Sequence, residues 1–515
     1  MANISENNKR ITKNTLLLYF RMLFMMAVNL YTSRVILNTL GVVDYGINNV
    51  VGGVIAMLGF LTGSLGAASS RYITYDLGKG DMALMRETFG NILSIHFILA
   101  GIVFVVSETL GLWFMSTQLQ IPPERETAAM WVYQFSIFSS VLAVISVPYN
   151  ATIIAHEKMS AFAYISIADA VLKLLIVYLL VVIPYDKLIV YAILFFCIQA
   201  FDRIVYGIYC SRHFDETRTK PRYNGKLFKE IFVFAGWSMN GSLAVIGYTQ
   251  GLNILLNIFF GPAINAARGI AVQVQTVVQN FCSNFQMAFN PQLTKCYAQN
   301  NLQYMHQLLT ASSKYSFYIL WMLILPIMYI APQILKWWLG VVPDYTISFL
   351  RIILIVGIVT GLSKPLVTSI HATGNIKQFQ IIEGCMMLSI VPIAYITLKF
   401  TKAPPESVFL IHLVIEILTQ YARMRIVLKN ICMPISDYMK GVISPILKVV
   451  VLSPILPTIV YFFIKQTICL CILICFTSLI NILIVVYFCG CTPHEKNVAK
   501  NKILELLSKI RKETI

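Results

Sequence analysis

The sequence predicts an all-α polytopic membrane protein, with about fourteen transmembrane helices forming two pseudo-symmetric six-helix lobes and two extra C-terminal helices. Of its 515 residues, 57% are hydrophobic and only 12% are charged, where ordinary globular proteins have roughly 25% charged residues. Apolar stretches of about 20 residues, long enough to cross a bilayer, recur along the chain. These observations exclude a secreted protein, a soluble enzyme and a disordered chain.

Each apolar stretch ends at polar or basic residues, so the expected helices can be placed in order. The first should be retained as a transmembrane helix, because it is longer than a signal-peptide core and lacks a small-residue cleavage site. We expect spans over about 14–37, 44–68, 88–115, 127–150, 161–183, 187–210, 229–258, 263–290, 312–336, 346–370, 377–399, 406–428, 441–464 and 468–490.

A repeat with an offset of about 220 residues relates the first six spans to the next six. Leu37–Gly41 ends the first span as Leu256–Gly261 ends the seventh, and Pro148 and Pro365 occupy matching places in the fourth and tenth. Both prolines are candidate hinges, although each could equally be a structural kink. The predicted organisation is an N-terminal lobe (1–210), a basic cytoplasmic linker (211–228), a C-terminal lobe (229–430), two further spans (431–490) and an amphipathic cytoplasmic tail (491–515).

The net charge of +17 is explained by membrane topology. With the amino terminus inside, the inner segments collect about 26 Lys and Arg and the outer segments about 6, which predicts cytoplasmic termini. The cations are scattered through short loops, so we expect no nucleic-acid partner. Neither a phosphate-binding loop nor a metal-ligand pattern is present in the sequence, so we expect a membrane transporter that is not an enzyme and has no cofactor or metal site.

One polar line runs along the eighth span. Arg268, Gln275, Gln279 and Gln286 are separated by 7, 4 and 7 residues, which places their side chains on one face of a helix. Amides and a guanidinium on one face suit a cavity that binds sugar hydroxyls and phosphate. The alternative is amide hydrogen bonding between packed helices.

Ionisable residues inside other spans are further candidates for function, because such residues usually face a cavity. Arg21 lies well inside the first span and is a candidate anion contact. Asp169 and Lys173 share one face of the fifth span, either as a structural ion pair or as an ion-coupling or substrate-gated pair. Glu383 and Glu416 could bind a coupling cation or have a packing role.

Several segments resemble one family of transporters: Asn14–Arg21, Tyr31–Gly41, Asp44–Gly46 and Phe234–Trp237. They are similar to bacterial O-antigen and capsular polysaccharide repeat-unit flippases, which belong to the multidrug/oligosaccharidyl-lipid/polysaccharide (MOP) exporter superfamily. The resemblance covers about residues 10–430. It implies two six-helix lobes around a cationic cavity, and movement of undecaprenyl-pyrophosphate-linked oligosaccharide across the bacterial cytoplasmic (inner) membrane.

We therefore expect a flippase for O-antigen or capsule precursors that works by alternating access. The head group would meet Arg21 and Lys173, then pass along the polar line of the eighth span. Expected partners are the polyprenyl-pyrophosphate glycan, membrane lipids, H⁺ or Na⁺ as coupling ion, a polysaccharide polymerase and glycosyltransferases. The alternatives are a cation-coupled multidrug and toxin extrusion antiporter and a non-transporting scaffold of a glycan-synthesis complex.

Overall fold

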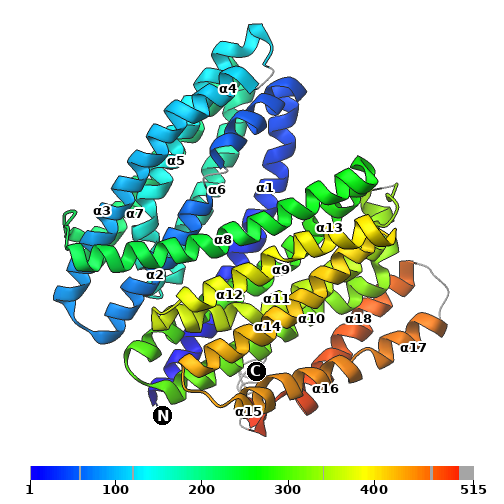
Figure 1. Ribbon diagram of the computed structural model, residues 1–515. Coiled ribbons are helices and arrows are strands. Elements are labelled where there is room, and N and C mark those ends of the chain that lie inside the picture. Colours follow the sequence, from blue (N-terminus) through cyan, green and yellow to red (C-terminus); the bar gives the residue numbers. More distant parts are fainter. Residues whose placement is uncertain are drawn as a thin grey trace, which may run out of the picture. The chain divides into compact units, whose positions relative to one another are not determined.

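The computed structural model describes residues 2–56, 59–118, 121–339, 341–463, 468–493 and 495–497. All of its regular elements are helical within these ranges (Figure 1). The α-helices are α1 (Ala2–Ala56), α2 (Gly59–Lys79), α3 (Met82–Val106), α4 (Leu112–Gln118), α5 (Glu126–Ala155), α6 (Met159–Val182), α7 (Lys187–His213), α8 (Gly225–Phe260), α9 (Pro262–Ala298), α10 (Leu302–Leu339), α11 (Thr346–Thr373), α12 (Lys377–Leu388), α13 (Ile390–Thr401), α14 (Glu406–Asn430), α15 (Ile435–Tyr438), α16 (Ser444–Leu452), α17 (Ile455–Phe463) and α18 (Ile468–Val485).

The helix count confirms the predicted fold class. The described residues form 14 long helices, of which 11 are long and apolar enough to cross a membrane. Gly41 lies between the first two predicted spans, and its backbone there (φ 78°, ψ 170°) interrupts α1 with a kink. Glycine adopts this left-handed conformation without a steric penalty, so the chain can turn here between two helical segments.

Several helices differ in extent from the sequence prediction, among them α2 and α8. α2 continues to Lys79, beyond the predicted end of the second span at 68. α8 begins at Gly225, inside the predicted linker 211–228. The side chain of Asn224 accepts hydrogen bonds from the amides of Lys226 and Leu227, at 3.1 and 3.4 Å, and so caps this helix.

The chain packs into two compact units, each assembled from separate segments. The first unit comprises Met1–Gly247, Met287–Met305 and Thr368–Cys385, and the second comprises Tyr248–Gln286, His306–Val367 and Met386–Ile515. Five helices, α8, α9, α10, α11 and α12, therefore contribute to both units. The predicted lobes divide the chain at one linker instead, and their boundaries stay a prediction.

In the first unit, α5 packs against α2, α3 and α7, and α1 packs against α6. Figure 1 shows α3, α5 and α7 running side by side. Buried apolar side chains fill the space between these helices, among them Val51, Val132, Tyr133, Ile137 and Val177. This packing fixes the directions in which α1, α6 and α7 present their polar side chains.

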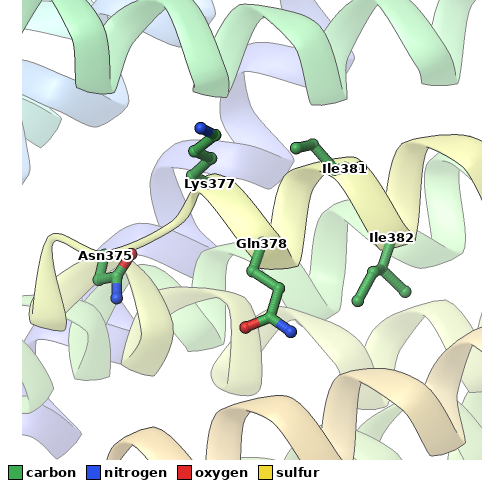
Figure 2. Close-up of a pocket in the computed structure, with 5 residues that line it drawn as sticks. All are labelled: Asn375, Lys377, Gln378, Ile381 and Ile382. Carbon is green, nitrogen blue, oxygen red and sulfur yellow. The ribbon is translucent and has the colours of Figure 1, made fainter.

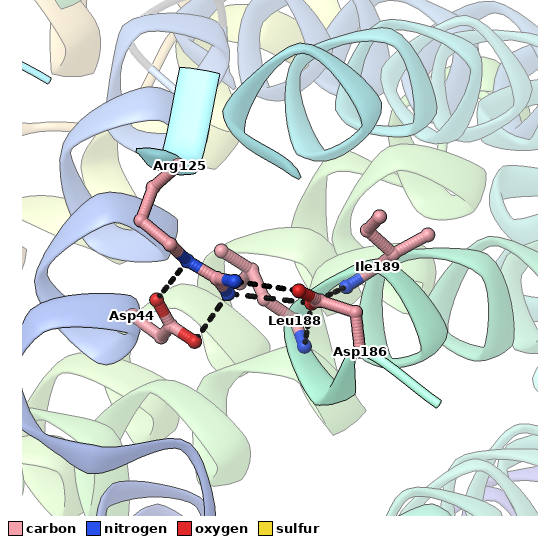
Figure 3. A network of polar contacts seen from close by, with 5 residues as sticks. All are labelled: Asp44, Arg125, Asp186, Leu188 and Ile189. Carbon is pink, nitrogen blue, oxygen red and sulfur yellow. Dashed lines mark hydrogen bonds and ion pairs between the residues drawn. The ribbon is translucent and has the colours of Figure 1, made fainter. Parts of the chain in front are cut away.

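An ion-pair network joins three chain segments at one end of the first unit (Figure 3). The Arg125 guanidinium donates to both carboxylate oxygens of Asp44, at 2.8 and 2.5 Å, and to both oxygens of Asp186, at 2.5 and 3.3 Å. Asp186 also caps α7 by accepting from the amides of Leu188 and Ile189. The network therefore ties the start of α7 to α1 and to the turn before α5.

In the second unit, the helices after α14 are anchored on α10. The Lys314 ammonium, which is only 1% exposed, donates to both carboxylate oxygens of Glu495, at 2.9 and 2.7 Å. Trp321 donates to the Ser453 hydroxyl at 2.7 Å, and Tyr318 donates to the Gly490 carbonyl at 3.1 Å. The predicted amphipathic tail lies mostly outside the described residues.

Candidate functional site

A polar cluster lies between α1, α6 and α7 in the first unit. Asp169 is 9% exposed and accepts a hydrogen bond from Lys173 at 2.8 Å, so these two residues form the ion pair that their spacing allows. Asp202 on α7 interacts electrostatically with both Asp169 and Lys173. Arg21 on α1 donates to the Ser166 hydroxyl on α6 at 3.3 Å.

The cluster brings two carboxylates together beside one ammonium. The two carboxylates repel each other electrostatically, and the ammonium of Lys173 offsets part of that repulsion. Sequence reasoning selected Asp169 but missed the role of Asp202. The only signal was that Asp202 and its neighbour Arg203 point in different directions on one span, so that each needs a partner on another helix.

Arg21 is half-buried, and its guanidinium lies over the Phe162 ring, 4.4 Å from the ring centre. An arginine can make both contacts at once, because its planar guanidinium stacks on an aromatic face while its N–H groups donate at the edge. Arg21 and Lys173 thus both contact residues of α6, Ser166 and Asp169, and their role in binding a head group stays a prediction.

The predicted polar line on α9 lies against neighbouring helices of the second unit. Gln279 donates to the Gly357 carbonyl of α11 at 2.5 Å. Gln286 is 2% exposed and donates to the Ser316 hydroxyl on α10 and the Gly361 carbonyl on α11, both at 2.9 Å. These contacts are of the interhelical kind that the sequence left as the alternative, and cavity lining by this line stays a prediction.

Glycines on α11 explain this close packing. A Cβ atom added at Gly357 would lie 3.1 Å from the Gln279 amide nitrogen and 3.3 Å from that of Gln275. The absence of side chains thus lets the amides reach the backbone. Farther along the line, Arg268 donates to the Thr249 carbonyl at 2.9 Å and to the Asn253 side chain at 3.3 Å.

Lys364 was missed by the sequence analysis. It is half-buried in the middle of α11 and donates to the Ser283 hydroxyl of α9 at 2.6 Å. Within the described part of the chain, no carboxylate forms an ion pair with it. The available signal was a lone lysine before Pro365 in an otherwise apolar span.

The other predicted residues are divided between the two units. Glu416 is 2% exposed and accepts from Arg423 at 2.7 Å and from Thr360 at 3.4 Å, which favours a packing role over cation binding. Glu383 is half-buried on α12 in the first unit, whereas Glu416 belongs to the second. Both hinge candidates, Pro148 and Pro365, lie inside long helices, and their hinge role stays a prediction.

A small hollow of about 260 Å³ lies at the start of α12 (Figure 2). It is lined by Asn375, Lys377, Gln378, Ile381 and Ile382. The Lys377 ammonium lies 5.6 Å from the centre of the Trp237 ring. All five lining residues come from one short segment, and none is a predicted site residue, so this hollow is separate from the polar clusters.

No protein-family model matches the chain, and no curated protein matches it by sequence. Solved structures do match its fold. An outward-facing multidrug resistance MATE family transporter of the MOP superfamily aligns with a TM-score of 0.68 and 16% identity, over 83% of this chain and 96% of that chain. A MOP superfamily transporter from Pyrococcus furiosus, for which a reversed polarity of the binding pocket suggests a different function, aligns with a TM-score of 0.70 and 15% identity, over 84% and 96%. The chain thus has the two-lobed, multi-pass fold of MOP transporters.

Proposed function

We propose that this protein is an alternating-access exporter that moves a lipid-linked oligosaccharide with an anionic head group across the membrane. Lys364 carries the proposal, because its ammonium lies in a membrane helix and is held by the Ser283 hydroxyl instead of a carboxylate. A charged side chain at the centre of a membrane-spanning helix costs about 2.5–3.5 kcal/mol on insertion scales, so a lysine inside such a helix is a candidate for function. An ammonium held by a neutral group remains available for a phosphate oxygen.

Arg268 supports the same cargo. Its guanidinium is held by the Thr249 carbonyl and the Asn253 side chain, both uncharged groups, in the same unit as Lys364. Two cations with neutral partners attract an anion such as a pyrophosphate more strongly than an organic cation. Gln275, beside Gly357, could then donate to sugar hydroxyls.

The remaining roles follow from this cargo. Arg21 and Lys173 would make the first contact with the head group, while the polyprenyl tail stays in lipid. In a bacterial cytoplasmic membrane with both termini inside, outward movement of an anion is favoured by about 2.3 kcal/mol per charge per 100 mV. A polymerase and glycosyltransferases would be the partners that consume and supply the glycan.

A cation-coupled multidrug and toxin extrusion antiporter is the second candidate. The observation that favours it is the Asp169 and Asp202 pair, which suits exchange of H⁺ or Na⁺ during transport. The structural neighbours agree with this candidate at least as well as with the flippase. In the flippase, the same pair would serve as the coupling site.

Reconstituted liposomes separate these functions. We would measure transbilayer movement of a polyprenyl-pyrophosphate oligosaccharide for wild type, Lys364→Met and the charge-conserving control Lys364→Arg, with efflux of a cationic dye in parallel. The flippase predicts glycolipid movement that Lys364→Met lowers at least tenfold, the equivalent of one charge-assisted bond, and that Lys364→Arg largely keeps.

Other outcomes contradict the proposal. Dye efflux without glycolipid movement, abolished by Asp169→Asn, would establish the antiporter. Movement of neither compound by protein that keeps its helical circular dichroism spectrum would favour the non-transporting scaffold.

A further inference from the structure

A buried carboxylate joins segments of the first unit that are far apart in the sequence. Glu157 lies in the short connection between α5 and α6, and its side chain is 1% exposed. One carboxylate oxygen accepts from Lys295 at 2.6 Å and the other from Gln292 at 2.7 Å, both on α9. Asn14 of α1 donates to the Glu157 backbone carbonyl at 3.4 Å. Helices α1 and α9 therefore meet the connection between α5 and α6 at this residue.

The backbone at Glu157 is of a kind that usually carries glycine. Its φ angle is 58°, and it follows the last turn of α5. The Glu157 amide donates to the Ile154 carbonyl at 2.9 Å and the Lys158 amide to the Ile153 carbonyl at 3.0 Å, the hydrogen bonds of a Schellman motif. Glycine would relieve the strain of this conformation, so a glutamate here indicates a task for the side chain.

Two further contacts join the same helix ends. Gly78 of α2 lies against α9, because a Cβ atom added there would be 2.8 Å from the Cβ of Ala298. Arg71 of α2 donates to the carbonyls of His371 and Ala372 at the end of α11, at 3.2 and 3.4 Å. The contact at Glu157 is thus one of several contacts between two groups of segments. One group is α1, α2 and the connection after α5, and the other is the ends of α9 and α11.

We infer that Glu157, Gln292 and Lys295 form a latch that closes the predicted cytoplasmic side of the transporter and opens once in every transport cycle. Glu157 belongs to the predicted lobe 1–210, and Gln292 and Lys295 belong to the predicted lobe 229–430. The inference rests on the alternating access of the proposed function. A buried ion pair suits a reversible contact, because the hydration that its charges regain on opening offsets much of their lost attraction.

Hydrogen exchange measured by mass spectrometry in lipid nanodiscs tests the latch without any cargo. Glu157→Gln removes the charge of the latch, and Gly78→Leu separates α2 from α9 without changing a charge. Glu416→Gln is the matched control, because Glu416 is also a buried carboxylate, 2% exposed, but binds Arg423 at 2.7 Å within the second unit. The latch predicts about tenfold faster exchange over residues 287–298 in both test variants. In Glu416→Gln, these residues should exchange as in wild type.

Wild-type exchange over 287–298 in both test variants would overturn the latch, as would an equal increase in the control. The double variant Glu157→Lys with Lys295→Glu should restore slow exchange, since the two charges exchange places and still attract each other. The glycolipid assay then separates the two inferences. Faster exchange in a protein that moves no glycolipid would refute the cargo and leave the latch standing, whereas glycolipid movement with unchanged exchange would refute the latch alone.

Discussion

Replacing Arg125 by alanine should destabilise the first unit, because one side chain there holds three segments together (Figure 3). The guanidinium makes four hydrogen bonds of 2.5–3.3 Å to Asp44 and Asp186. Arg125→Ala removes all four and leaves two carboxylates with no cation between them. Asp186 keeps its hydrogen bonds to the amides of Leu188 and Ile189, so α7 retains its cap.

The expected loss of stability follows from the exposure of the three side chains. Arg125 is 25% exposed, Asp44 18% and Asp186 32%, so the network lies between a surface pair and a buried one. Exposed pairs contribute about 0–1 kcal/mol, and breaking a buried pair costs about 3–5 kcal/mol. We therefore expect Arg125→Ala to lower the free energy of unfolding by about 2 kcal/mol, roughly a 30-fold change in the folded-to-unfolded ratio.

Equilibrium unfolding in mixed detergent and SDS micelles, followed by circular dichroism, measures this change. Arg125→Lys should lose about half as much, because an ammonium keeps the charge but not the two-sided geometry of the guanidinium. The matched control is Arg218→Ala, which breaks an exposed pair with Asp215 and should change stability by less than about 0.5 kcal/mol. If Arg125→Ala and Arg218→Ala unfold alike, the reasoning from burial and bond number is refuted.

Three further predictions concern stability. Burial raises the pKa of Asp186, but the hydrogen bonds from Arg125 and from two backbone amides together lower it by a larger amount. The pKa therefore lies below its ordinary value of 3.8. The ionised Asp186 therefore contributes its full stabilisation above about pH 3.8, and this stabilisation is lost as the pH falls through the folded-state pKa. In acid unfolding, Arg125→Ala should lose less stability over this pH range than wild type does. Glu495→Gln should destabilise more than Lys314→Met in thermal unfolding, because it leaves an ammonium that is 1% exposed without a counter-charge, whereas Glu495 is 22% exposed and can be hydrated. Gln286→Leu should cost about 1 kcal/mol for two interhelical hydrogen bonds and leave cargo movement unchanged, whereas lost movement at unchanged stability would assign this residue to the cavity.

The helices were predictable because apolar length is a local property of the chain. The kink at Gly41 was foreseeable as a boundary between two apolar stretches, and α9 was predicted with its polar line on one face. The sequence prediction began the span of α8 after its true start, because the capping role of Asn224 depends on which backbone amides its side chain can reach in the folded chain. Helical spacing also predicted the Asp169 and Lys173 pair correctly, since residues four apart on one helix are neighbours whatever surrounds them.

The sequence by itself determined that this protein lies in a membrane, that it is helical, and on which helix faces the polar residues are aligned. Only the tertiary structure decided what each face meets. Gln286 contacts α10 and α11, Lys364 meets a hydroxyl, and Glu157 binds a lysine 138 residues away. The physical reason is that lipid is as apolar as the helices themselves, so hydropathy selects no partner for a helix face. Partners are selected by close packing at glycines and by hydrogen bonds between distant residues, neither of which is encoded in local spacing.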